Sequence, residues 1–76
     1  MKRESFEIWT VYERPSDFPD MYVARRFEIT AGKAEPTTEF IAAKLLAPVR
    51  RAMQERGLYR IDRNPNDEPQ IVECWL

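Results

Sequence analysis

Histidine is absent from this 76-residue sequence, and cysteine occurs once, as Cys74. Histidine is the commonest general base and the commonest metal ligand, so its absence removes the residue on which many catalytic and metal sites depend. A single cysteine rules out a disulfide bond within the chain, and neither serine has a histidine to serve as its base. These absences argue against catalysis, and we expect no enzyme activity, no cofactor and no metal site.

The sequence also lacks an excess of charge, a glycine-rich segment and a long apolar run. Twelve Lys and Arg residues face 13 Asp and Glu residues, so no overall positive field attracts the chain to nucleic acid. The two glycines, Gly32 and Gly57, are too far apart to form a phosphate-binding loop. No segment approaches the ~20 apolar residues of a membrane helix, and no signal-type apolar stretch follows the charged start. We therefore expect a cytoplasmic protein that does not enter a membrane.

The composition is that of one small folded domain spanning residues 1–76. Hydrophobic residues make up 43% of the chain and charged residues 33%, which is typical of globular rather than disordered proteins. A domain of this size buries only about 60% of the surface that its unfolded chain exposes. The composition is therefore equally compatible with a modestly stable monomer and with a homodimer that buries more surface.

Hydrophobic alternation and β-branched or aromatic residues predict strands. The predicted segments are 6–12, 21–29, 37–43, 58–62 and 70–76. The first two are expected to form an antiparallel hairpin with a long loop, and polar turns are predicted at 31–36 and 64–69. Residues 37–43 are ambiguous, with a helix as the alternative to a short strand. The last segment has large apolar residues on both faces, so we expect it inside the sheet rather than at an edge.

A helix is predicted at residues 46–56, where apolar residues recur at helical spacing. Pro48 is tolerated in a first turn, which favours a start near Leu46. Arg56 followed by Gly57 is typical of a helix end. The sequence thus predicts an α+β fold in the order β-β-(β)-α-β-β, with one antiparallel sheet of four to five strands and one helix packed on one face.

One short helix covers only one side of such a sheet, so the other side must be open or covered by another molecule. An apolar surface rimmed by charge often marks a binding site. Alternation places Trp9 with Val11 on one side of the first strand, and Ile71 with Trp75 on one side of the last; the register that would bring them together is not given by the sequence. The alternative is that both tryptophans are core residues. The candidate partner-binding residues are Trp9, Val11, Arg26, Ile71 and Trp75.

The first predicted loop and its surroundings contribute charged and aromatic side chains. Candidate loop contacts are Asp17, Phe18, Arg25 and Arg63. A pocket lined by Asp17, Arg25 and Arg63 would indicate an enzyme, because a carboxylate held near cations can do acid–base work. Solvated turn residues are the simpler interpretation.

Several short motifs occur along most of the chain. They are Phe6-x-x-Trp9-x-Val11-Tyr12, Asp17-Phe18-Pro19, Val23-Ala24-Arg25-Arg26, Arg60-x-x-Arg63-x-Pro65-x-Asp67-x-Pro69 and the ending Ile71-Val72-Glu73-x-Trp75-Leu76. In this order they resemble a group of short bacterial proteins of unassigned function. The resemblance implies a bacterial or phage origin and a compact stand-alone domain, and it implies nothing about activity.

These patterns predict a small non-catalytic domain that binds protein, either an unidentified partner or a second copy of itself as a homodimer. The alternative is single-stranded nucleic-acid binding through aromatic and arginine residues on an open sheet face. Acidic residues are interleaved with the arginine clusters. This weakens the alternative, because phosphate binding depends on accumulated positive charge.

Overall fold

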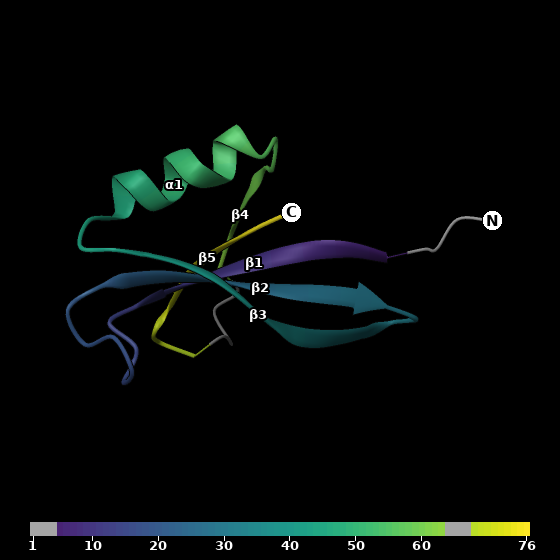
Figure 1. Cartoon of the computed structure of the whole chain (residues 1–76), viewed down its shortest axis with the longest axis horizontal. Helices are drawn as coiled ribbons and strands as arrows, with labels where there is room; N and C mark the ends of the chain where they lie inside the picture. The colour runs from purple at the N-terminus through teal and green to yellow at the C-terminus, as the bar shows by residue number, and fades with distance from the viewer. Residues whose placement is uncertain (1–4, 64–67) are drawn as a thin grey trace.

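One antiparallel sheet and one helix form the part of the chain that the computed structural model describes, residues 5–63 and 68–76 (Figure 1). The elements in chain order are β1 (Ser5–Glu13), β2 (Tyr22–Thr30), β3 (Lys33–Ala43), α1 (Leu46–Glu55), β4 (Arg60–Asp62) and β5 (Ile71–Trp75). The strand order is β3-β2-β1-β5-β4, and neighbouring strands are antiparallel. The predicted fold class is confirmed, with residues 37–43 in a strand. No helix in the described ranges is long and apolar enough to cross a membrane.

A two-residue turn joins β2 to β3. Ala31 (φ 54°) and Gly32 (φ 79°) both lie in the left-handed region, as in the type I′ turn, whose twist matches that of the flanking strands. The turn predicted at 31–36 is therefore too long, because Lys33 already pairs with Thr30 and Pro36 with β2. Proline is tolerated here because β3 is an edge strand, where a missing N–H need not interrupt the ladder.

Helix α1 begins where its sequence predicts and ends one residue earlier, at Glu55. Pro48 lies in the first turn, where a backbone N–H has no intrahelical partner to lose. At the other end Gly57 has φ 77°, and its N–H donates to the carbonyl of Gln54 at 2.9 Å. The N–H of Leu58 donates to the carbonyl of Met53 at 3.2 Å. These two bonds form a Schellman motif, which satisfies the last carbonyls of the helix.

Strand β5 lies inside the sheet, between β1 and β4, as predicted. Trp9 of β1 and Trp75 of β5 are direct Cα partners. The register then shifts, so that Tyr12 is opposite Ile71. Because a one-residue shift moves side chains to the other face, Ile71 shares the side of Tyr12 and not that of Trp75.

The core lies between α1 and one side of the sheet, which we call the helix side. Its buried members are Trp9, Val11, Ala24, Val49, Met53 and Trp75. A buried tryptophan removes about 150–250 Å² from water, so the two indoles dominate this small core. Figure 1 shows α1 on this side of the sheet, whereas the loop between β1 and β2 lies on the opposite side.

Candidate functional site

The side of the sheet away from α1, which we call the open face, has no helix over it (Figure 1). Apolar side chains from all five strands lie on it, including Phe6, Ile8, Phe27, Ile29, Phe40, Ile61 and the predicted binding residue Ile71. Phe6 is 62% exposed, and Phe40 and Ile61 are also exposed, while the other four are half-buried. Apolar side chains gathered on one face, rather than scattered singly, are the feature that marks an interaction surface.

The open face carries almost no charge. Among the described strand residues that the register places on it, Arg25 is the one charged residue. The carboxylate of Asp17, in the loop between β1 and β2, pairs with its guanidinium. The helix side differs sharply, since its strand residues include Glu7, Arg26 and Glu73. In a chain of which 33% is charged, a side of the sheet with so little charge is suited to apolar contact.

The loop between β1 and β2 covers one end of the open face. The ring of Phe18 packs against that of Phe40, with 5.3 Å between centroids, and Asp17 pairs with Arg25. Three of the four predicted loop contacts are thus brought to one place. Arg63 instead donates from Nη2 to the backbone carbonyl of Glu68 at 3.4 Å. The loop closes one end of the face and leaves the end bearing Phe6 uncovered.

Of the two interpretations of the tryptophans, the structure supports the one in which both are core residues. Trp9 and Trp75 are 1% and 3% exposed, and Val11 is fully buried, all beneath α1. The two predicted sets do meet through the Trp9–Trp75 pairing, but on the helix side, and Ile71 leaves them at the register shift. The physical reason is that burying two indoles gains more than burying smaller side chains, so the helix covers the face that carries them.

Each buried indole N–H is satisfied by the glutamate two residues before it. Trp9 Nε1 donates to Glu7 Oε1 at 2.8 Å, and Trp75 Nε1 donates to Glu73 Oε2 at 2.9 Å. Because the two tryptophans are cross-strand partners, the sheet carries two similar indole–carboxylate units side by side. Each unit allows a large apolar ring to be buried without an unsatisfied donor.

Arg26, predicted to flank the binding face, lies on the helix side among carboxylates. Its Nε donates to Glu7 Oε1 at 3.0 Å, and its other nitrogens lie 3.3 Å from Glu39 Oε1 and 3.6 Å from Glu28 Oε2. Burial would raise the pKa of Glu7, but hydrogen bonds from Trp9 and Arg26 outweigh it and the pKa is lowered. Arg26 therefore balances acidic side chains of the helix side and does not flank the open face.

Glu73 is a carboxylate that is only 1% exposed. Arg50 Nη2 donates to its Oε1 at 2.8 Å and Arg50 Nε to its Oε2 at 3.1 Å, while Arg60 Nη1 lies 3.7 Å from Oε1. Burial would raise the pKa of Glu73, but the hydrogen bonds from Arg50 and Trp75 and the charges of both arginines lower it. The carboxylate is therefore ionised at neutral pH and holds Arg50 in a fixed position.

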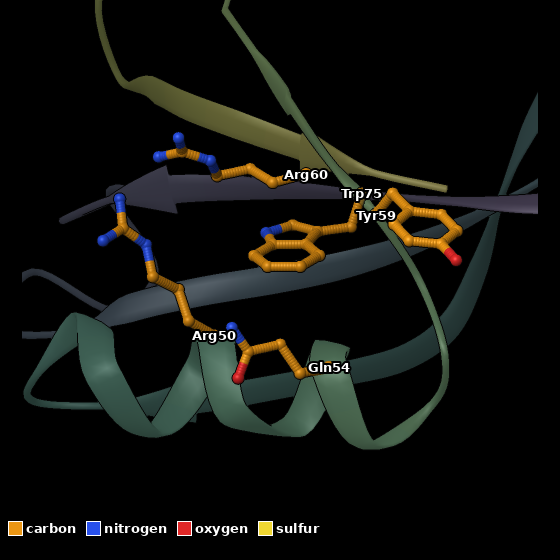
Figure 2. A pocket seen from close by; sticks show the side chains of 5 residues that line it. All are labelled: Arg50, Gln54, Tyr59, Arg60 and Trp75. Atoms are coloured by element: carbon orange, nitrogen blue, oxygen red, sulfur yellow. The ribbon is translucent and has the colours of Figure 1, made fainter.

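A hollow of about 480 Å³ opens beside Arg50, and we call it the arginine hollow. It is lined by Arg50 and Gln54 of α1, Tyr59 and Arg60, and Trp75 of β5. Figure 2 shows the guanidinium groups of Arg50 and Arg60 at one end, the ring of Tyr59 at the other and the indole of Trp75 between them. The pocket that would indicate an enzyme, lined by Asp17, Arg25 and Arg63, is not this one. No group of three or more metal-ligating side chains occurs within residues 5–63 and 68–76.

Sequence reasoning missed most residues of both surfaces. The apolar alternation of Phe6 with Ile8, and of Phe27 with Ile29, was a signal for a second apolar face. Nothing in the sequence indicated that Arg50 meets a glutamate 23 positions away. No protein family, curated protein or solved structure matches the chain, so its function is inferred from these two surfaces.

Proposed function

We propose that the chain is a non-catalytic protein-interaction domain and that its open face binds the open face of a second copy, giving a homodimer. The observation that carries the proposal is the uncovered apolar side of the sheet, with Phe6 62% exposed. Two sheets packed face to face about 10 Å apart would bury these side chains in a shared core. The same contact would supply the apolar burial that so small a domain lacks.

Charge supports a second copy as the occupant. A two-fold contact places identical surfaces against each other, so any net charge on the face would repel itself. The one strand charge on the open face, Arg25, is matched by Asp17 of the same chain. The open face is therefore complementary to itself without help from a differently charged partner.

The area that a standard interface needs is a modest part of the exposed surface. The protein exposes 5542 Å², and a standard interface takes about 800 Å² from each partner, or about one seventh of this surface. A dimer through the open face would therefore use a modest share of the surface.

Two copies could instead associate by pairing their edge strands, but both edges of the sheet are poorly suited to this. The edge strand β3 contains Pro36 and a register irregularity opposite Arg26, and the edge strand β4 has only three residues, of which Arg60 and Asp62 are charged. Proline, bulges, short length and charge are the features that prevent edge pairing. Association through the face is therefore favoured over association through an edge.

The nucleic-acid alternative has no observation in its favour. Stacking of bases requires accessible rings, and the predicted platform of Trp9 and Trp75 is buried. Phosphate binding requires unpaired cations, and the one cation among the described strand residues of the open face, Arg25, is paired with Asp17.

Sedimentation analysis from low to high micromolar concentration tests the proposal with three variants. Phe6→Asp and Ile61→Asp place a charge on the open face, and Leu45→Asp does so at a residue that is as exposed (68%) but lies at the start of α1. We expect a dimer for the unaltered protein, a dissociation constant raised by about tenfold or more for the first two variants, and no change for Leu45→Asp. A monomer at high micromolar concentration, or an equal effect of Leu45→Asp, would contradict the proposal.

A further inference from the structure

We infer that the arginine hollow binds a small ligand through a carboxylate or phosphate group. The hollow lies on the helix side, between α1, β4 and β5, so it is separate from the open face and independent of the proposed dimer. Its volume of about 480 Å³ falls within the range of about 300–1,000 Å³ that is usual for small-molecule sites.

The first argument is that Arg50 is already in place. Its Nε and Nη2 are held by Glu73 at 3.1 and 2.8 Å, and Glu73 is fixed in turn by the indole N–H of Trp75 at 2.9 Å. These bonds engage one edge of the guanidinium, so its Nη1 group is the edge available to a ligand. An arginine held by a buried carboxylate loses less side-chain entropy on binding than a mobile one.

The second argument is that Arg60 adds a second cation with spare donors. Arg60 lies 3.7 Å from Glu73 through Nη1 and 3.7 Å from Asp62 through Nη2, and both distances exceed that of a hydrogen bond. Asp62 is almost fully exposed, so water screens its charge. Two guanidinium groups thus line the hollow, and the carboxylate near both of them, Glu73, is not one of its lining residues, which leaves a net positive site.

The third argument is the direction of the side chains. The two guanidinium groups come from different elements and lie at the same end of the hollow (Figure 2). Planar guanidinium forks match the geometry of carboxylate and phosphate oxygens. The amide of Gln54 adds a neutral hydrogen-bonding group, and the largely exposed ring of Tyr59 at the far end offers an apolar surface for the rest of the ligand.

The choice of variant follows from the Glu73 contacts. Replacing Arg50 would leave a buried carboxylate without its main partner and would endanger folding. Arg60→Gln removes one guanidinium while the Arg50–Glu73 pair remains. Arg51→Gln is the matched control, because Arg51 is exposed on α1, carries the same charge and does not line the hollow.

Isothermal titration with inorganic phosphate and with benzoate at low salt tests the inference, with sodium chloride as the control for ionic strength. We expect saturable binding of at least one anion to the unaltered protein, weakened by about tenfold or more in Arg60→Gln because a charged hydrogen bond is lost, and unchanged in Arg51→Gln. Stronger binding of benzoate than of phosphate would assign the site to carboxylates with an apolar body, and the reverse to phosphates. Absence of saturation with both anions, or equal weakening in both variants, would overturn the inference.

Discussion

Arg50 and Glu73 form a bidentate ion pair that connects α1 to β5, with Nη2 2.8 Å from Oε1 and Nε 3.1 Å from Oε2. The carboxylate is 1% exposed, whereas the arginine side chain is 39% exposed. The pair thus has one end in the core and the other in water. It joins the helix to the strand that carries Trp75, and its arginine lines the arginine hollow.

Arg50→Met is expected to lower the free energy of unfolding by about 2–4 kcal/mol, because Glu73 would remain buried without its main partner. This loss is in the lower part of the range that is usual when a buried ion pair is broken. The reason is that Arg50 is partly exposed, so water screens the charges of the pair. Urea denaturation followed by tryptophan fluorescence measures it. Arg51→Met, on the exposed side of the same helix, should change stability by no more than about 0.5 kcal/mol; a loss as large as that of Arg50→Met would show that the ion pair is not the cause.

The lowered pKa of Glu73 makes stability depend on pH in a defined direction. Its folded-state pKa lies below the ordinary value of 4.5, so its contribution is fully present above that pH and is lost as the pH falls through the folded-state value. Denaturation curves between neutral pH and pH 3 should therefore show a plateau followed by a decline. In Glu73→Gln the decline should be shallower, whereas Glu55→Gln, at an exposed position of α1, should keep the full slope.

Ala31→Asn is expected to stabilise the protein by about 0.5–1 kcal/mol. Ala31 has φ 54° in the turn between β2 and β3, and alanine is strained there, whereas Asn-Gly is the preferred pair for a type I′ turn. Thermal unfolding should show a raised midpoint. The same substitution at Ala34, within β3 and without a positive φ, should give no gain, because asparagine is depleted in strands.

Leu45→Asp is expected to stabilise α1 by about 1 kcal/mol. Leu45 occupies the N-cap with extended backbone and makes no side-chain capping bond, and the first turn of the helix has no acidic residue. An aspartate at this position can accept a backbone N–H bond and interact favourably with the helix dipole. Urea denaturation measures the gain, and Leu45→Ala, which removes the apolar side chain but cannot cap, should not reproduce it.

The elements were predictable where local chemistry decides them. Pro48 and Gly57 predict the limits of α1, and the apolar residues on both faces of the closing strand predict its inner place. The turn length was not predictable from composition, because residues 33–36 look like a turn and only the left-handed conformations of Ala31 and Gly32 place the reversal earlier.

The sites were less predictable because they depend on register and on the choice of face. The alternating residues of β1 are apolar on both sides, Phe6 with Ile8 and Trp9 with Val11, so either side was a reasonable open face. The open face is the side that α1 does not cover. The packing of α1 on the sheet is a tertiary property, so the local sequence pattern does not reveal it. The meeting of Arg50 with Glu73 likewise requires the helix to lie across β5, which no local pattern encodes.

The insertion of β5 between β1 and β4 has a consequence for biosynthesis. While the nascent chain emerges from the ribosome, β1, β2 and β3 can pair as successive hairpins, but one edge of β1 stays unpaired until β5 arrives more than fifty residues later. Unpaired strand edges are sites of aggregation. Slow translation of the segment after α1 should therefore reduce the yield of native protein more than slow translation of the first hairpin.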